Sequence, residues 1–454
     1  MPRLFGTDGV RGVANLDITA ELALTLAATT AHVLREKDEL KGPRPRAIVG
    51  RDTRISGPML SNAVAAGLAG AGIDVHDVGV LPTPGVAHLV SAHDADMGVV
   101  ISASHNPVED NGIKFFGRGG SKLDDAVETR IEESLHHDWT RPQGAHVGSV
   151  TVSPEFSTTY VAHLIHAVQK FAESPEPLKG LSVVIDAAHG AASEVGPQAL
   201  VQAGAVVKVI NAEPDGLNIN AGVGSTHLEG IQEAVVAAEA DFGVAFDGDA
   251  DRCLAVDHRG EVVTGDHILG ILAEAMKNRG SLYRDTVVAT VMSNLGFHRG
   301  MRSAGIEIVE TAVGDRYVRE AMQAEGYTLG GEQSGHIIVS EFSTTGDGIL
   351  TALLLGSCVV SSGKSLAQLC QHIETCPQVL INVPDVDKSR VYSDDPLQQA
   401  VARVRDELGS EGRVLLRASG TEPLVRVMVE ADTDTRARSH AQLLAKVVAE
   451  RLAL

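Results

Sequence analysis

The chain has few basic residues for its size, and this shortage limits what it can bind. It contains 38 Lys and Arg against 59 Asp and Glu in 454 residues, which gives a formal net charge of −21. A chain with this charge repels nucleic acid and anionic membranes, so any phosphate that it binds must be held by local Arg and Lys side chains. We therefore expect no nucleic-acid partner and no membrane partner.

Cysteines and long apolar runs are also scarce. Cys253, Cys358, Cys370 and Cys376 form no C-x-x-C pair and adjoin apolar sequence, which favours buried reduced thiols in a cytosolic protein. The N-terminus lacks the apolar core of a signal peptide. The most apolar stretch, residues 349–360, is shorter than the ~20 residues that span a bilayer. A cytoplasmic location is expected.

The chain is too long for one ordinary core, and its pattern alternates between strands and helices. Residues 19–35 predict a helix capped by Thr19, and a short strand, AIVG, then ends in the polar residues RDTR. Such alternation is typical of parallel α/β architecture, in which loops at strand ends carry the chemistry. From shifts in composition we expect three similar α/β domains over residues 1–150, 151–253 and 254–374, and a smaller α+β domain over residues 375–454.

A serine follows one of the apolar runs. Residues 99–107 read VVISASHNP, in which β-branched residues give way at once to small polar ones. The pattern predicts a buried strand that delivers Ser104 and His105 to the carboxyl edge of a sheet, where open α/β sheets bind ligands. The alternative is an ordinary loop serine.

Three carboxylates follow a second apolar run, where FGVAF leads into DGDADR. Asp247, Asp249 and Asp251 stand at alternate positions, so on an extended backbone they point the same way and can converge on one hard cation, for which Mg²⁺ is the natural choice. An EF-hand is excluded, because its required Gly and Glu are replaced by Arg252 and His258. A solvated acidic turn is the alternative.

Three glycine-rich loops offer groups suited to a sugar phosphate. Residues 330–336 (GGEQSGH) supply a carboxylate, an amide and a hydroxyl for sugar hydroxyls, and residues 417–423 (RASGTEP) supply a guanidinium and hydroxyls for a phosphate. In residues 6–12 (GTDGVRG) the backbone can approach a ligand closely. Each loop alone could be an ordinary turn. Gly-rich residues 218–227 lack the last glycine of a dinucleotide fingerprint, and Cys358 stands where a P-loop ending in residues 363–365 needs Gly.

Lys114 lies between apolar neighbours shortly after Ser104. A surface lysine is the usual explanation of such a residue. A partly desolvated lysine, however, has a lowered pKa and can exchange protons near neutrality. We favour the functional interpretation.

In this order, these motifs resemble the α-D-phosphohexomutase superfamily, over essentially the whole chain. The resemblance implies four domains around a central cleft and a phosphate shift in two transfers. Phosphorylated Ser104 gives its phosphoryl group to a sugar monophosphate. The resulting bisphosphate then rotates within the site and returns its other phosphate to Ser104. It also implies glucosamine 1,6-bisphosphate or glucose 1,6-bisphosphate as the primer, small-molecule sugar phosphates as partners, and a monomer or homodimer.

The resemblance also assigns site residues. It gives catalytic roles to Ser104, Lys114, His105 and Arg11, with Lys114 and His105 as candidates for moving the hydroxyl proton. It places Mg²⁺ on Ser104, Asp247, Asp249 and Asp251. His336 can equally be a structural histidine in a turn. The substrate-binding residues that it implies are Arg252, Glu332, Ser334, His336, Arg417, Ser419, Gly420, Thr421 and Arg426.

Two short runs indicate a branch of the superfamily. The sugar loop EQSGH and the run GSTH at residues 224–227 are similar to the phosphoglucosamine branch, which interconverts glucosamine 6-phosphate and glucosamine 1-phosphate and feeds UDP-N-acetylglucosamine and cell-wall precursor synthesis. Val223 departs from the cysteine that is frequent there. The phosphomannomutase and phosphoglucomutase branches, which usually differ at Gln333, are the alternative. An inactive sugar-phosphate binding protein and a metal-dependent phosphatase are rivals from other classes.

Overall fold

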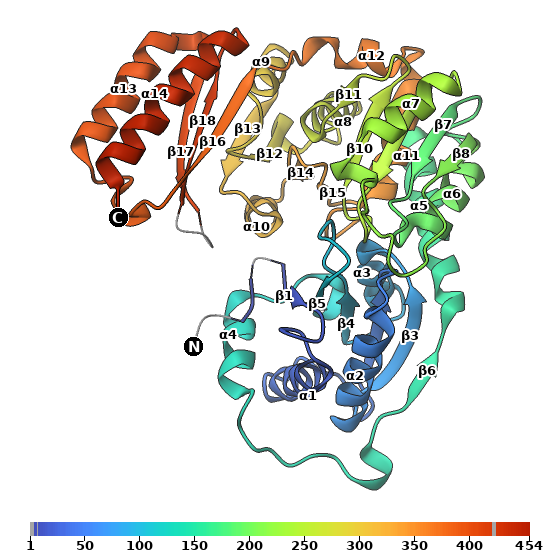
Figure 1. Ribbon diagram of the computed structural model, residues 1–454. Coiled ribbons are helices and arrows are strands. Elements are labelled where there is room, and N and C mark those ends of the chain that lie inside the picture. Colours follow the sequence, from blue (N-terminus) through green and yellow to red (C-terminus); the bar gives the residue numbers. More distant parts are fainter. Residues whose placement is uncertain (1–3, 7, 420–423) are drawn as a thin grey trace. The chain divides into compact units, whose positions relative to one another are not determined.

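The computed structural model describes residues 4–6, 8–419 and 424–454, which fold into two compact units (Figure 1). The larger unit comprises Met1–Met292 and Ile306–Cys370 and contains three β-sheets. The smaller unit comprises Ser293–Gly305 and Gln371–Leu454 and contains a fourth sheet.

The first sheet has six strands in the order β1-β5-β4-β2-β3-β6. Its centre is parallel, whereas β1 and β5 run antiparallel to their neighbours. Every residue of β4 is buried, as the apolar run before Ser104 predicts. The strands are β1 (Val10–Val13), β2 (Arg46–Arg51), β3 (Asp74–Val80), β4 (Met97–Ile101), β5 (Asp110–Phe116) and β6 (Val150–Val152), and the helices are α1 (Ala20–Glu36), α2 (Gly57–Gly70), α3 (Thr83–Ala92) and α4 (Asp125–Ser134).

The second sheet has five strands in the order β11-β10-β9-β7-β8. Strand β9 is buried throughout and ends at the predicted acidic loop. Strand β10 follows that loop and pairs antiparallel with β9, so the hairpin that begins beyond the expected boundary at residue 253 belongs to this sheet. The elements are β7 (Ser182–Asp186), β8 (Val206–Ile210), β9 (Phe242–Phe246), β10 (Cys253–Asp257), β11 (Val262–Val263), α5 (Ser157–Ala172), α6 (Ala192–Gln202) and α7 (Glu229–Ala237).

The third sheet has four strands in the order β13-β12-β14-β15. Strands β14 and β15 form an antiparallel pair joined by the glycine-rich sugar loop. The elements are β12 (Thr286–Thr290), β13 (Glu307–Thr311), β14 (Leu329–Gly331), β15 (Ile337–Val339), α8 (Gly265–Asn278), α10 (Asp315–Glu325), α11 (Gly348–Ser362) and α12 (Leu366–Leu369).

The smaller unit packs helices on a three-stranded antiparallel sheet of order β16-β18-β17. Its apolar core includes residues from the sheet and from α13 and α14. The elements are α9 (Leu295–Ser303), β16 (Gln378–Pro384), α13 (Asp395–Leu408), β17 (Arg413–Ala418), β18 (Leu424–Glu430) and α14 (Asp434–Leu452).

Local signals in the sequence coincide with element ends. Thr19 caps α1, because its hydroxyl accepts a hydrogen bond from the backbone N–H of Leu22 over 3.2 Å.

All four cysteines are free, but Cys370 is only partly buried, which corrects the expectation of four buried thiols. Among the described residues, no single helix is long and apolar enough to cross a membrane, and one bent pair of helices passes that test only when taken together.

Candidate active site

Ser104 lies in the loop at the carboxyl end of β4 and is fully buried. Its backbone has a φ of 54°, in the left-handed region that a non-glycine residue adopts only when its surroundings hold it there. Its backbone N–H donates a hydrogen bond to Ser102 Oγ over 2.9 Å. The nucleophile predicted from the sequence is therefore a fixed and buried residue.

The hydroxyl of Ser104 lies against the acidic loop of the second sheet. Ser104 Oγ donates to Asp247 Oδ2 over 2.5 Å, and His105 Nδ1 lies 3.3 Å from the same hydroxyl oxygen. The pKa of His105 is lowered to about 4, mainly by burial and also by repulsion from Arg252 and Arg11. His105 is therefore neutral near neutral pH.

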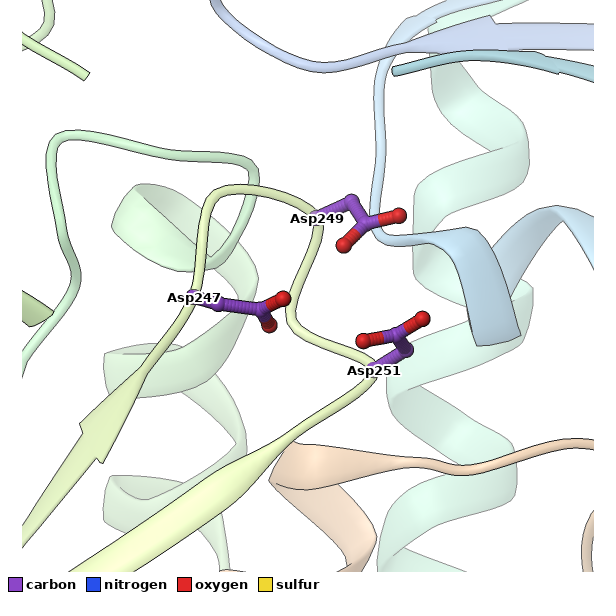
Figure 2. A group of neighbouring side chains, drawn as sticks. All are labelled: Asp247, Asp249 and Asp251. Atoms are coloured by element: carbon purple, nitrogen blue, oxygen red, sulfur yellow. The ribbon is translucent and has the colours of Figure 1, made fainter. Parts of the chain in front are cut away.

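The three aspartates converge, as Figure 2 shows, and their ligand oxygens lie within 4.8 Å of one another. We expected an extended backbone to bring the three carboxylates together, and this is wrong. They converge because the loop turns sharply, with Ala250 at a φ of 54°. Burial and repulsion from Asp251 and Asp249 raise the pKa of Asp247 well above its usual range. Close carboxylates of this kind are costly without a cation.

The aspartates have oxygen lone pairs to offer. Within the part of the chain that the structure describes, Asp249 Oδ1 and Asp251 Oδ1 are buried and have no hydrogen-bond partner. Buried polar atoms normally find a partner, and an all-oxygen donor set suits a hard divalent cation. The residues present therefore fit a metal ion.

Lys114 on β5 is buried beside these carboxylates. Its Nζ lies 2.7 Å from Asp249 Oδ2, 2.9 Å from Asp8 Oδ2 and 3.6 Å from Asp251 Oδ2. Burial alone would lower the pKa of Lys114, but attraction to the three carboxylates outweighs it and raises the pKa above its usual range. The lowered pKa that we expected from desolvation is therefore wrong for this arrangement, because the sequence does not show the carboxylates around Lys114.

Two arginines complete the cationic side of the site. Arg11 on β1 donates a hydrogen bond to Asp8 Oδ2. Its guanidinium is also attracted electrostatically to Asp249 and Asp251. Arg252 Nε lies 3.9 Å from Asp251 Oδ1. The structure thus brings both predicted arginines to the acidic loop, where they can meet phosphoryl oxygens.

The sugar loop between β14 and β15 joins the acidic loop through the backbone. Cys253 N–H donates to Gly335 O over 3.0 Å, and Glu332 Oε1 accepts a hydrogen bond from Gly314 N–H over 3.1 Å. Ser334 Oγ and His336 Nδ1 are buried and without a hydrogen-bond partner among the described residues. These atoms can accept or donate bonds to a ligand.

His336 also has a structural contact, because the N–H of Gly346 donates to its Nε2 over 3.2 Å. The structure is therefore compatible with a substrate-binding role for His336 and with a structural role.

The predicted phosphate loop belongs to the smaller unit. Arg417 on β17 stands directly opposite Arg426 on β18, and burial, then repulsion from Arg426, lowers the pKa of Arg417. Like charges facing each other across strands are destabilising, and an anion would relieve that cost. Ser419 is buried, and its N–H donates to Leu424 O over 2.9 Å. Gly420 and Thr421 lie outside the described residues.

Sequence reasoning missed several residues that support the site. Asp8 lies in the first glycine-rich loop, but only the fold shows that it accepts hydrogen bonds from Arg11 and Lys122. Thr83 donates to Asp249 Oδ2 over 2.6 Å, and Lys388 donates to Ser419 O over 2.7 Å. Neither Thr83 nor Lys388 belongs to a motif that could have marked it.

Four family models match the chain in succession. They describe domains I, II and III of phosphoglucomutase/phosphomannomutase and the C-terminal domain, over residues 2–141, 158–260, 264–376 and 380–447. The predicted fold class of three α/β domains and a smaller C-terminal domain is thereby confirmed.

Known proteins give the same result at higher similarity. The chain is 59% identical to a phosphoglucosamine mutase of Nocardioides sp. and 58% identical to one of Streptomyces griseus, each over the whole of both chains. A phosphoglucomutase/phosphomannomutase family protein of Burkholderia thailandensis shares the fold at 23% identity, with a TM-score of 0.80 over 100% of this chain and 99% of that one. An N-acetylphosphoglucosamine mutase of Aspergillus fumigatus shares it at 16% identity, with a TM-score of 0.69 over 99% and 96%. The chain therefore belongs to the phosphoglucosamine mutases of the phosphohexomutase superfamily.

Proposed function

We propose that this enzyme interconverts glucosamine 6-phosphate and glucosamine 1-phosphate and that Ser104 carries the transferred phosphoryl group. The observation that carries the proposal is the contact of Ser104 Oγ with Asp247, beside two carboxylates that have unpartnered oxygens. A phosphorylated serine needs a strong positive partner at this place, because phosphorylation adds about −1.5 to −2 charges. The family named above supports the choice of an amino sugar.

Ser104, Asp247, Asp249 and Asp251 would hold Mg²⁺. When bound, this ion would neutralise charge on the phosphoryl group and orient it for in-line displacement. Arg11 and Arg252 border the same carboxylates and would stabilise the phosphoryl oxygens.

The proposed reaction is balanced over two transfers. In the first transfer, the free hydroxyl oxygen of the sugar monophosphate forms a bond to phosphorus and the bond from phosphorus to Ser104 Oγ breaks. In the second transfer, after the sugar bisphosphate has rotated within the site, Ser104 Oγ forms a bond to its other phosphorus and the bond from that phosphorus to the sugar oxygen breaks. The proton of the attacking hydroxyl leaves in the first step and a proton returns to the sugar oxygen in the second. His105, whose imidazole is neutral, is the candidate acceptor, and Lys114, whose ammonium is stabilised by the carboxylates, is the candidate donor.

Two loops would hold the sugar phosphate in both orientations. Glu332 and Ser334 suit hydroxyls that both orientations present, and His336 Nδ1 offers a further polar atom. The arginine pair of β17 and β18 suits the phosphate that does not react, together with the neighbouring loop. The residues that we propose for this second role are Arg417, Ser419, Gly420, Thr421 and Arg426.

The wider setting follows from the same proposal. Glucosamine 1,6-bisphosphate or glucose 1,6-bisphosphate would prime Ser104, and the product would enter UDP-N-acetylglucosamine synthesis in the cytoplasm. We propose a monomer or a homodimer that binds only small sugar phosphates, with domain boundaries near residues 150 and 374. The boundary expected at residue 253 is not retained, because strands β10 and β11 pair with the second sheet.

A ³¹P NMR time course tests the function. The enzyme is given Mg²⁺, a trace of sugar bisphosphate and, in parallel, the 6-phosphates of glucosamine, glucose and mannose. We expect a 1-phosphate signal that grows fastest from glucosamine 6-phosphate, with no free phosphate. Faster turnover of glucose or mannose phosphate would overturn the substrate, and release of inorganic phosphate alone would indicate a phosphatase.

A further inference from the structure

The polar segment that follows β2 contains Arg54, the largest fully buried side chain described. Its guanidinium donates Nε–H to Asp52 Oδ2 over 2.9 Å, and its two terminal nitrogens donate only to backbone carbonyls of the Ser104 loop. An arginine has five guanidinium N–H groups, and the side chain uses all of them here. The acceptor carbonyls are Ser104 O at 3.1 Å, Asn106 O at 2.8 Å, Asp110 O at 3.0 Å, and Pro107 O.

The carboxylate paired with Arg54 reaches the other side of the nucleophile. Asp52 Oδ2 accepts a hydrogen bond from Ser102 Oγ over 2.7 Å, and Ser102 Oγ in turn accepts one from the N–H of Ser104 over 2.9 Å. The buried pair therefore fixes the peptide groups on both sides of Ser104. The nucleophile needs such support because its φ of 54° is unfavourable for a residue with a side chain.

We propose that Arg54 is a positioning residue for phosphoryl transfer. It holds the Ser104 loop in the one conformation that presents Ser104 Oγ to Asp247, without touching the sugar phosphate itself. Lysine cannot replace it, because a single ammonium group offers three donors around one point and not a planar fork. This inference rests on the proposed transfer through Ser104.

The loop that follows β8 of the second sheet provides an independent contact with the Ser104 loop. Asn220 Nδ2 donates to Ser104 O over 2.8 Å and to Asn106 O over 3.1 Å, which are two of the carbonyls that Arg54 holds. If these carbonyls set the position of Ser104, removal of either donor slows transfer. The two effects are then coupled, because they act on the same atoms.

Arg259 offers a matched control. Its backbone N–H and Nε–H donate to Asp257 over 2.8 Å and 3.0 Å, which repeats the local bonds between Arg54 and Asp52. Its side chain, however, is 59% exposed, and its hydrogen bonds stay within its own hairpin. Arg259→Lys therefore measures the effect of removing an arginine with the same local bonds that does not contact the Ser104 loop.

The experiment measures single-turnover transfer from the phosphorylated full-length enzyme to glucosamine 6-phosphate. Because a misplacement of about 1 Å can cost 10²-fold, we expect Arg54→Lys to lower the rate about 10- to 100-fold, with KM for the sugar phosphate near the wild-type value. The ³¹P signal of phosphorylated Ser104 should also shift and broaden. Arg259→Lys should transfer at the wild-type rate.

Several outcomes would overturn the inference. These are a wild-type transfer rate in Arg54→Lys, or a loss shared equally by Arg259→Lys. If Arg54→Lys does not fold, Asn220→Ala decides, and transfer at the wild-type rate in that variant contradicts the role of these carbonyls. A wild-type enzyme that takes no phosphate on Ser104 would instead refute the proposed function.

Discussion

Ser104 Oγ donates a hydrogen bond to Asp247 Oδ2 over 2.5 Å, although the two residues are 143 positions apart in the chain. The contact joins the loop after β4 of the first sheet to the loop after β9 of the second. Both loops leave the carboxyl ends of strands, which is where open α/β sheets bind ligands. The proposed phosphoryl carrier and the proposed cation site therefore adjoin each other.

Asp247→Asn is expected to weaken the cation site. Loss of one charged ligand should lower the affinity for Mn²⁺, used as a spectroscopic substitute for Mg²⁺, at least about tenfold. Phosphoryl transfer should fall with it. Electron paramagnetic resonance of free Mn²⁺ measures the affinity. Asp186→Asn is the control, because Asp186 is a buried carboxylate at the end of β7, outside the aspartate group. Equal Mn²⁺ affinity in Asp247→Asn and wild type would contradict the site.

Lys114→Met should have opposite effects on cation binding and on catalysis. Its ammonium lies within 2.7–3.6 Å of carboxylate oxygens of Asp249, Asp8 and Asp251, so its removal leaves more negative charge for a cation to balance. We expect tighter Mn²⁺ binding, slower phosphoryl transfer, and a loss of about 3–5 kcal/mol of unfolding free energy because a buried pair is broken. Unchanged or weaker Mn²⁺ binding would argue against this role.

Gly265→Ala should disturb the sugar loop from outside the site. A Cβ at Gly265 would lie 2.2 Å from Glu332 O and 2.6 Å from Gly335 N, so the loop must move. We expect KM for the sugar phosphate to rise about tenfold or more, with Mn²⁺ affinity unchanged. Gly230→Ala is the control, because nothing lies within 4 Å of its Cβ position. Steady-state kinetics that show equal KM values for both variants would contradict the contact.

Asp347 should make stability fall as the pH rises. It caps α11 and accepts hydrogen bonds from Tyr160 Oη at 2.9 Å and 3.0 Å, and burial raises its pKa to about 7. Between the unfolded pKa near 4 and the folded pKa, the unfolded chain binds fewer protons than the native state, so the native state loses about 1.4 kcal/mol per pH unit.

Asp347→Asn removes this titration. The difference in melting temperature between the variant and the wild type should therefore move in favour of the variant from about pH 4 to pH 7, and then become constant. Thermal unfolding at a series of pH values measures it. A difference that does not depend on pH would show that Asp347 titrates normally.

Much of the fold could be predicted because it depends on local patterns. The buried runs before Ser104 and Asp247 are strands β4 and β9, and Thr19 caps α1 where the sequence predicts a helix start. The family resemblance covered the whole chain and was confirmed by the four family models. Signals within a few residues were sufficient for the strands and the helix cap, whereas the family assignment used motifs along the whole chain.

The electrostatics of the site could not be predicted, because they depend on contacts between distant segments. The pKa of Lys114 is raised and not lowered, because the fold brings carboxylates from distant positions to its ammonium group. Asp8 lies 106 positions before Lys114 in the chain, and Asp249 lies 135 positions after it. The sequence also favoured an extended acidic loop, whereas a turn at Ala250 brings the carboxylates together. Arg54 was visible only as one polar residue at a strand end, and only the fold shows its five donors in use.

Transfer of a labelled phosphoryl group tests the central claim most directly. Wild-type enzyme and Ser104→Ala are incubated with Mg²⁺ and ³²P-labelled glucose 1,6-bisphosphate, digested, and their peptides separated. We expect the wild type to carry label only on the peptide that contains Ser104, and to pass it to glucosamine 6-phosphate when that sugar is added. Labelling or transfer by Ser104→Ala at a rate comparable to the wild type would contradict Ser104 as the phosphoryl carrier.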